Sequence, residues 1–275
     1  DGDHRDLHLS IRRQRQMCIR DRAYKYLSLQ GGGKNIAEML GGTLITNDTR
    51  SPQHKQLLNV VEEMAIAAGM TVPPVYLIRE DSINAFAAGF SQQDAVIGIN
   101  QGTLDLLNRE ELQGVVAHEF SHILNGDMSL NLRLIAVLHG IVFIGMIGYG
   151  VIRGAMFQRK NGLAMLALGA GLIAIGFGGM FFGNLIKASV SRQREYLADA
   201  SAVQFTRLQS GIANALKKIG SHTQQSHMLN TSAEQASHMF FGSILPKFSS
   251  GLMATHPPLD QRIRAIDPNL SLIHI

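Results

Sequence analysis

Two long stretches without a charged side chain constrain the fold of this chain more than any other feature. They are Leu134–Ile152 and Asn161–Ile186, which contain 19 and 26 residues. A helix needs about 20 apolar residues to cross the hydrocarbon core of a bilayer, so both stretches are long enough to span it. Because the linker between them is short and basic, the pair is typical of a hairpin of two transmembrane helices.

Three residues within the hairpin bear on its packing. Gly179 and Gly183 lack side chains, so we expect the backbones of the two helices to approach closely there. His139 lies in the first stretch, where an ionisable group is a functional candidate, although we favour a hydrogen-bonded role between the helices. A hairpin buried inside a soluble protein is the alternative interpretation of the same pattern.

Charge and cysteine content exclude two kinds of function. Charged residues make up 17% of the chain, against roughly 25% in ordinary soluble domains. Half of the net charge of +4 comes from the first 22 residues, which contain six arginines and four aspartates, so a nucleic-acid partner is not indicated. Cys18 is the one cysteine, so any transition metal must be bound by His, Asp or Glu side chains.

The two ends of the chain differ in character from the rest. Residues 10–22 and 270–275 resemble translated sequencing-adapter sequence. We therefore interpret residues 1–22 and 270–275 as non-native, and we expect the biological sequence to be a fragment of about residues 23–269.

The residues before the hairpin show both helical and strand-like patterns. Apolar residues recur at spacings of three and four over residues 55–70, which predicts an amphipathic helix that ends near Gly69. After two prolines, three short apolar runs predict a small β-sheet, with strands at 75–78, 84–90 and 95–99.

A second helix is predicted over residues 109–124. Asn108 precedes it and Glu111 stands at its third position, a combination that caps the first backbone N–H groups. Asn125 and Gly126 can adopt the left-handed conformation that ends a helix, and a further helix is expected from about Met128.

This second helix contains His-Glu-Phe-Ser-His at residues 118–122. Residues four apart on a helix point in similar directions, so His118 and His122 can share one tetrahedral metal ion. Glu119 then lies beside the open position of the metal. A chance match to His-Glu-x-x-His is rare, so we predict a zinc site; two exposed histidines on a helix are the alternative.

A hydrolytic zinc site needs a third protein ligand and keeps its fourth position for water. The run Glu195-Tyr-Leu-Ala-Asp199 offers two carboxylates four residues apart on a predicted helix. One can bind the metal while the other accepts a hydrogen bond from a ligating histidine and fixes its orientation. In isolation the pair would indicate a solvated helix face. Because a hairpin returns the chain to the side of the membrane that it left, the two motifs can meet.

Taken together, these motifs resemble the HtpX-like membrane metalloproteases, which follow the gluzincin plan and are relatives of the CAAX prenyl protease. The resemblance implies one zinc ion per chain, bound by His118, His122 and Glu195, with Glu119 as the catalytic base and Asp199 bonded to a ligand. Members usually carry a further membrane hairpin before the catalytic domain, which we expect in the natural protein. The similarity runs from Ala23 to Pro268 and includes NAFA (84–87), HEFSH (118–122), the hairpin, SRQREYLADA (191–200) and THPPLDQRI (255–263).

The resemblance also implies the fold and the domain organisation. We expect a mainly α fold with a small β-sheet, an α+β metalloprotease domain of the zincin type, plus a transmembrane helical hairpin. Residues 23–133 and 187–269 would form the two parts of the metalloprotease domain, with the hairpin at residues 134–186 inserted between them.

Catalysis and substrate binding follow from these residues. Zinc lowers the pKa of bound water to about 7, and Glu119 is placed to accept the proton and pass it to the leaving amine. His256, which precedes two prolines, either stabilises the oxyanion or packs as a loop histidine beneath them. The short strand near Asn84, Ala85 and Phe86 is expected to bind the substrate as an added strand.

The predicted function is a zinc-dependent membrane endopeptidase that acts on polypeptides. The resemblance implies a multi-pass protein of the bacterial inner membrane, with a cytoplasmic active site and a role in quality control of misfolded membrane proteins. Basic residues are nearly balanced between the linker and the hairpin ends, so charge does not decide the orientation. A non-catalytic membrane scaffold or chaperone-like binder and a soluble zinc peptidase with a buried hairpin are the alternatives; intact Glu119 argues against the scaffold.

Overall fold

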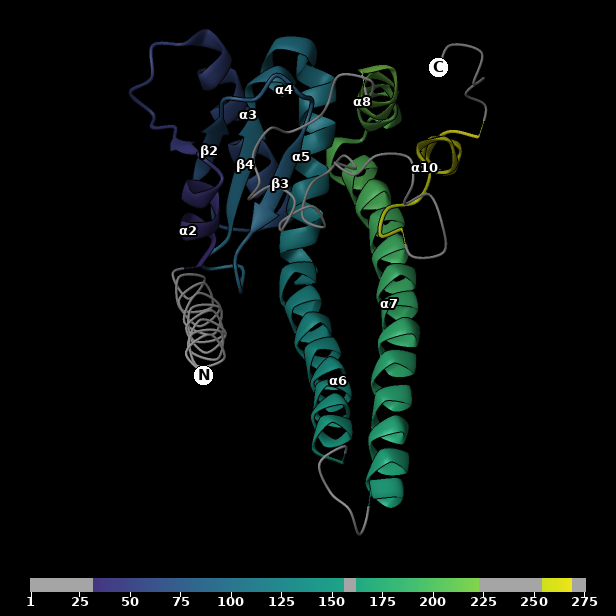
Figure 1. Cartoon of the computed structure of the whole chain (residues 1–275). Helices are drawn as coiled ribbons and strands as arrows, with labels where there is room; N and C mark the ends of the chain where they lie inside the picture. The colour runs from purple at the N-terminus through teal and green to yellow at the C-terminus, as the bar shows by residue number, and fades with distance from the viewer. Residues whose placement is uncertain (1–31, 156–161, 223–253, 269–275) are drawn as a thin grey trace.

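The computed structural model describes residues 32–155, 162–222 and 254–268. The interpretation of both chain ends as non-native therefore lies outside the described residues. Two long helices extend from a head of shorter helices and one small sheet, which confirms the predicted class (Figure 1). The described elements are α2 (Gly32–Met39), β1 (Thr43–Leu44), α3 (Pro52–Ala68), β2 (Val75–Ile78), β3 (Ala85–Ala88), β4 (Val96–Asn100), α4 (Gln101–Leu106), α5 (Arg109–Leu124), α6 (Asp127–Ala155), α7 (Gly162–Thr206), α8 (Gln209–His222) and α10 (Leu259–Ile266).

The sheet has the strand order β1-β2-β4-β3. β2 and β4 are parallel, whereas β1 and β3 pair antiparallel at the two ends. The strand predicted over residues 84–90 is shorter, because Gly89 takes a φ of +152° and starts the turn into β4. The strand predicted at 95–99 is shifted by one residue, to Val96–Asn100. β1 was missed because two residues are too few to leave an alternating pattern.

Helices cover both faces of the sheet, so β2, β3 and β4 are buried throughout. Successive side chains on a strand point to opposite faces. The face that includes Ala85 and Ala87 belongs to the main core, which also contains residues of α3, α5 and α8. The opposite face packs against α2 in a smaller cluster made up of Ile36, Ala37, Leu40, Tyr76, Ile78, Phe86, Ala88 and Val96.

The caps of two helices lie where the sequence predicts them. Asn108 Oδ1 accepts a hydrogen bond from the Glu111 backbone N–H at 2.9 Å, and Glu111 Oε2 accepts one from the Asn108 N–H at 2.8 Å. Gly69 ends α3 with a φ of +65°. α3 begins at Pro52, before the predicted start, because Ser51 caps it and proline suits the first turn of a helix.

The junction between α5 and α6 is a tight turn at Gly126, whose φ is +66°. The expectation that Asn125 is also left-handed is wrong, because its φ is −81°. The Asn125 side-chain amide instead donates to the carbonyl and the hydroxyl oxygen of Ser121. α6 then starts at Asp127, one residue before the predicted Met128.

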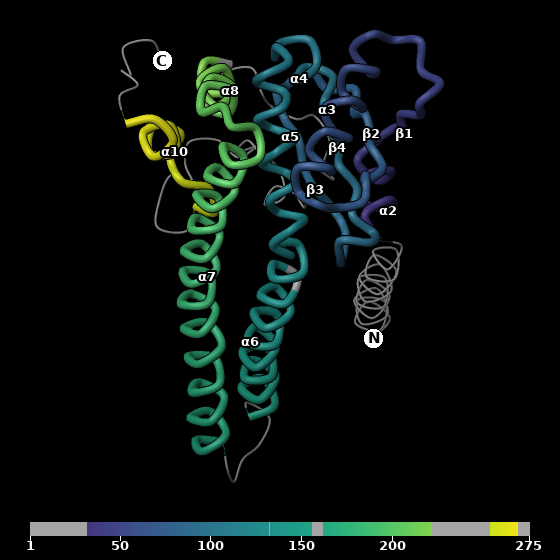
Figure 2. Tube along the Cα trace, turned by 180° about the vertical axis from the view of Figure 1, so that it is seen from behind, coloured from purple at the N-terminus to yellow at the C-terminus, as the bar shows by residue number. Residues whose placement is uncertain are grey.

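α6 and α7 lie side by side and extend away from the head in both views (Figures 1 and 2). Each is long and apolar enough to cross a membrane, and only 11% of the most apolar window of each is buried. A core helix of a soluble protein would be mostly covered by other protein atoms, so this exposure argues against the buried-hairpin alternative.

The contacts within the hairpin differ from those expected. The backbones approach closely at two glycine pairs. A Cβ built on Gly176 would lie 2.5 Å from the Gly145 Cα, and one built on Gly148 would lie 2.7 Å from the Gly169 carbonyl oxygen. Gly179 and Gly183 face side chains of α6 instead of its backbone. His139 is exposed and hydrogen-bonds the Ile135 carbonyl of its own helix at 2.9 Å, so the expected role between the helices is wrong.

Candidate active site

The candidate site lies where α5 meets α7. α5 is the central helix of the head, since it contacts α3, α7, α8 and β3. It is buried on most sides, and the polar side chains that it buries include His118, with 0% of its surface exposed, and Glu119, with 1%. α7 continues without a break from the apolar stretch through Glu195 and Asp199, so one helix carries both a membrane segment and two site residues.

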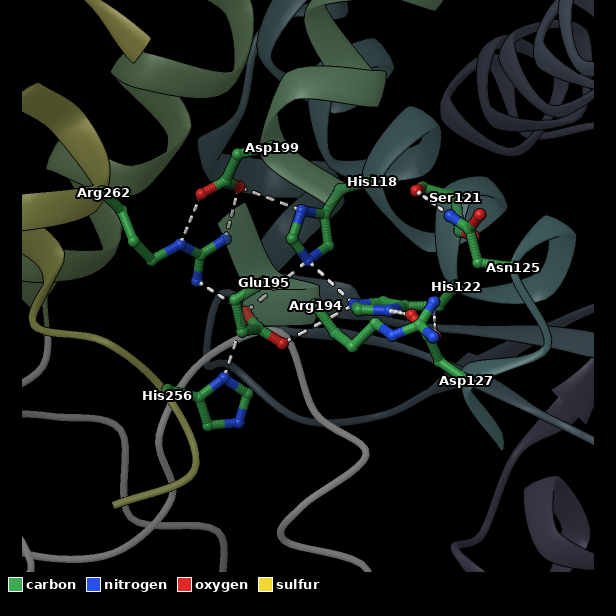
Figure 3. Close-up of polar contacts among 10 residues, drawn as sticks. All are labelled: His118, Ser121, His122, Asn125, Asp127, Arg194, Glu195, Asp199, His256 and Arg262. Atoms are coloured by element: carbon green, nitrogen blue, oxygen red, sulfur yellow. Dashed lines mark hydrogen bonds and ion pairs between the residues drawn. The ribbon is translucent and has the colours of Figure 1, made fainter. Parts of the chain in front are cut away.

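His118, His122 and Glu195 come together as predicted ligands should (Figure 3). His118 Nε2 lies 3.1 Å from His122 Nε2. The carboxylate oxygens of Glu195 lie 3.7 Å from His118 Nε2 and 3.6 Å from His122 Nε2. Two ligands bound at about 2.0–2.1 Å to a tetrahedral zinc ion lie about 3.3–3.4 Å apart. The two Glu195 distances involve different oxygens, Oε2 for His118 and Oε1 for His122, and one ligand atom from each of the three residues lies within 4.8 Å of the others. The donor set therefore fits a zinc ion in chemistry, and its atoms lie near the required spacing.

Asp199 contacts His118 at Nδ1, the ring nitrogen that does not face the other predicted ligands, and Arg262 pairs with Asp199. Asp199 Oδ1 lies 3.0 Å from His118 Nδ1, so the carboxylate can accept the ring N–H and leave Nε2 free for a metal. Arg262 on α10 donates to both oxygens of Asp199, at 2.8 and 2.6 Å. Its guanidinium also lies 3.1 Å from Glu195 Oε2. With 1% of its surface exposed, Arg262 is the largest fully buried side chain in the described residues.

Asp127 contacts His122 as Asp199 contacts His118, and Arg194 pairs with Asp127. Asp127 Oδ2 lies 2.8 Å from His122 Nδ1. Its other carboxylate oxygen lies 3.1 Å from Arg194 Nη1. Each of the two histidines therefore contacts an aspartate that is paired with an arginine (Figure 3).

His256 is also brought to the site. Its Nδ1 lies 3.1 Å from Glu195 Oε2, on a segment that leads through two prolines into α10. His256 Nε2 is buried and has no hydrogen-bond partner among the described residues. One ring nitrogen is thus held by Glu195 and the other remains available to a ligand.

The environment of Glu119 favours a carboxylate that can exchange a proton. Burial raises the pKa of Glu119 to about 7, with the negative charge of Glu195 adding to the effect and His122 opposing it. The backbone N–H of Ala87 hydrogen-bonds the carboxylate. Glu119 Oε1 is buried and accepts no hydrogen bond within the described part of the chain. A buried acceptor without a donor indicates a place for a polar ligand such as water.

The two histidines have different affinities for protons. Burial lowers the pKa of His118 to about 4, in spite of Asp199. Burial would also lower the pKa of His122, but the hydrogen bond with Asp127 and the charges of Glu195 and Glu119 raise it to about 9. The carboxylates around His122 thus favour a proton on its ring, and a proton competes with a metal ion for a histidine ligand.

β3 lies at the edge of the sheet beside α5. The Asn84 carbonyl accepts a hydrogen bond from the Asn100 N–H, and residues alternate along an antiparallel pair, so Phe86 also directs its backbone groups toward β4. The backbone groups of Ala85 and Ala87 therefore point away from β4, where the Asn84 side chain accepts from the Ala85 N–H and the Glu119 carboxylate accepts from the Ala87 N–H. Of the three residues predicted to bind the substrate, Ala85 directs its backbone groups away from β4, as does Ala87, whereas Asn84 and Phe86 do not. Their role in substrate binding remains a prediction.

Sequence reasoning also missed Asp127, Arg194 and Arg262 as parts of the site. Asp127 stands five residues after His122, beyond the helix that carries the motif, so helical spacing does not reveal it. Arg262 contacts Asp199 across 63 residues of sequence. In THPPLDQRI the arginine is flanked by Gln261 and Ile263, so its immediate neighbours do not mark it as buried.

Comparison with known proteins identifies the family. The profile of peptidase family M48 matches residues 51–269. A Protease HtpX homolog of Dictyoglomus turgidum is 39% identical over 220 residues, which cover 78% of this chain and 69% of that protein. A Protease HtpX homolog of Caldanaerobacter subterraneus is 38% identical over 216 residues, covering 76% of this chain and 70% of that protein.

A solved structure is similar in fold. The crystal structure of S. mikatae Ste24p matches with a TM-score of 0.53 at 17% sequence identity. The match covers 83% of this chain but 52% of the Ste24p chain, so this chain spans about half of that protein. The matched family, the similar relatives and the two apolar helices lead to one conclusion: the chain belongs to peptidase family M48 and is an HtpX-like membrane metalloprotease.

Proposed function

We propose that this chain is a zinc-dependent membrane endopeptidase in which His118, His122 and Glu195 bind one zinc ion and Glu119 is the general base. The observation that carries the proposal is the cluster of one ligand atom each from His118, His122 and Glu195, all within 4.8 Å of one another, near the spacing of a tetrahedral zinc site. Glu119 Oε1, which accepts no hydrogen bond from the described residues and lies one residue from His118, adds the second element of the mechanism.

The proposed reaction is hydrolysis of a peptide bond. When bound, zinc lowers the pKa of water to about 7 and polarises the substrate carbonyl. Glu119 accepts a proton from the attacking water and then donates it to the leaving nitrogen. The Ala87 N–H holds the Glu119 carboxylate in place while its other oxygen stays free to take the proton.

We assign His256 the role of stabilising the oxyanion that develops on the substrate carbonyl. Glu195 holds the ring through Nδ1, and Nε2 has no partner among the described residues. Because the Glu195 carboxylate can only accept the Nδ1 proton, Nε2 donates to the oxyanion when the ring carries both protons, as an imidazolium. A donor that is fixed before the reaction stabilises developing charge better than one that must reorient. The alternative, that His256 only packs beneath Pro257 and Pro258, predicts that its removal changes stability and leaves turnover intact.

The substrate is proposed to add to the edge of the sheet along β3. The backbone carbonyls of Ala85 and Ala87 point away from β4, and β3 contacts the helix that carries Glu119. Main-chain pairing recognises an extended peptide with little dependence on its side chains. This tolerance, with the similarity to HtpX homologues, supports a role in quality control of misfolded membrane proteins at the bacterial inner membrane, with a cytoplasmic active site.

The experiment compares Glu119→Gln with His118→Ala in detergent-purified protein. Glu119→Gln keeps the size of the side chain, so zinc content should equal that of the wild type while casein cleavage falls by about 10²- to 10⁴-fold. His118→Ala should lose both zinc and activity. Wild-type cleavage by Glu119→Gln with zinc bound would disprove the mechanism. A zinc-loaded wild-type protein that cleaves nothing would instead favour the non-catalytic scaffold.

A further inference from the structure

We propose that Asp127 and Arg194 are positioning residues that orient His122 toward the metal and connect metal affinity to the junction of the two membrane helices with the head. This inference rests on the proposed zinc site, because it concerns how that site is held. Nothing in the His-Glu-x-x-His spacing points to either residue.

The contact between Asp127 and His122 has the geometry that a ligating histidine requires. A histidine that binds a metal through Nε2 must carry its proton on Nδ1 and needs an acceptor there. Asp127 Oδ2 lies 2.8 Å from His122 Nδ1, and only 5% of Asp127 is exposed. The aspartate thereby fixes both the tautomer and the direction of the ring.

Arg194 supplies the charge that such a buried aspartate needs. Its Nη1 lies 3.1 Å from Asp127 Oδ1, the oxygen that does not face His122. A carboxylate that is buried without a counter-charge costs free energy, so Arg194 stabilises the ionised form that can accept from imidazole. The arrangement repeats that of Asp199 and Arg262 around His118.

The positions of the two residues in the chain give the pair its second role. Asp127 is the first residue of α6 and follows the left-handed turn at Gly126, so the turn sets its direction. Arg194 precedes Glu195 on α7. The ion pair therefore joins the start of one membrane helix to the other helix beside two predicted ligands. A change in the separation of α6 and α7 at the head would move Asp127 away from His122.

The test measures zinc affinity by chelator competition in Asp127→Asn, Arg194→Ala and a control, Asp105→Asn. Asp105 is exposed and accepts hydrogen bonds from Gln53 and Gln101, far from the predicted ligands in sequence. Asp127→Asn is expected to weaken zinc binding by about 10- to 100-fold, and Arg194→Ala by less, with no change in the control. The visible spectrum of cobalt-substituted protein should shift in Asp127→Asn, because the ligand field senses the orientation of His122.

Several outcomes overturn the inference. Wild-type zinc affinity and cobalt spectrum in Asp127→Asn would do so, as would a variant that unfolds at lower temperature without metal yet binds zinc normally. If Asp127→Asn does not fold, Arg194→Ala carries the test, because Arg194 is partly exposed, and unchanged affinity there is equally contrary. Glu195→Ala separates the two proposals: if it binds zinc as the wild type does, the proposed zinc site itself is wrong.

Discussion

The head and the hairpin of this protein are stabilised by different kinds of contact. In the head, buried charged side chains meet at defined distances, as Arg262 does with Asp199 and Glu195. In the hairpin, the helices meet where side chains are missing, at Gly145 and Gly176. The head is therefore stabilised by pairs of buried charged side chains, and the hairpin by the close approach of backbones that glycine permits. Substitutions should expose this difference directly.

The largest effect is expected in the head, from Glu195→Ala. Removal of one of three predicted ligands should abolish stoichiometric zinc binding, while the hairpin stays inserted because no hairpin contact is touched. Asp199→Ala should lower zinc affinity by a smaller factor, about 10- to 100-fold, because Asp199 acts through His118. Metal analysis measures the first loss and chelator competition the second. Equal zinc binding in both variants and the wild type would contradict the assignment.

A smaller effect is expected in the hairpin, from Gly176→Ala. A Cβ on Gly176 would lie 2.5 Å from the Gly145 Cα and 2.6 Å from its nitrogen, so the two backbones must separate. Overpacking of this kind typically costs about 1–3 kcal/mol. Thermal unfolding in detergent should show the loss.

Gly178→Ala is the matched control for that change. The position is on the same helix, and a Cβ there would have nothing within 4 Å. Both variants gain the same helix propensity from alanine, so their difference reports packing alone. If Gly176→Ala is as stable as Gly178→Ala, the close approach of the backbones does not stabilise the hairpin.

The smallest effect is expected on the surface of the head, from Asp94→Asn. Partial burial alone would raise the pKa of Asp94, but hydrogen bonds from the Ser91 hydroxyl and from the Phe90 and Ser91 N–H groups outweigh it and lower the pKa. The ionised aspartate thus stabilises the turn between β3 and β4. The variant should unfold at a temperature of the order of 2 °C lower at neutral pH.

The pH dependence of that difference follows from the sign of the shift. Because the folded pKa lies below the unfolded value of about 3.9, the stabilisation is complete above that value and is lost as the pH falls through the folded pKa. Unfolding temperatures of the two proteins should therefore converge in acid. A difference that persists at the lowest accessible pH would show that charge is not its source.

Local sequence patterns predict the helices more completely than they predict the candidate site. The spacing of His118 and His122 follows from helix geometry, and the cap at Asn108 follows from hydrogen-bonding chemistry. Spacing also selected Glu195 and Asp199, which the structure brings beside the histidines. Their roles as ligand and supporting carboxylate remain proposals.

The remaining features depend on contacts that sequence spacing does not encode. Charged residues are rarely fully buried, so nothing in composition predicts that Arg262 is enclosed between two carboxylates. Glycines are frequent in both hairpin helices, and which of them meet depends on the rotation of each helix, so Gly176 was not distinguished from Gly179. The contact of Asp127 with His122 depends on the direction that the turn at Gly126 gives to the chain.

The continuity of α7 also limits how far the proposed site can lie from the bilayer. Glu195 follows Ile186, the last residue of the uncharged stretch, by nine residues of unbroken helix. At a rise of 1.5 Å per residue, Glu195 is at most about 14 Å beyond the level of Ile186, whatever the tilt of the helix. Headgroups occupy roughly the first 5–7 Å of that span. A polypeptide needs only a few extended residues, at about 3.3 Å each, to reach this height from a membrane segment. We therefore expect a chain that has just emerged from the lipid to be within reach of the proposed site.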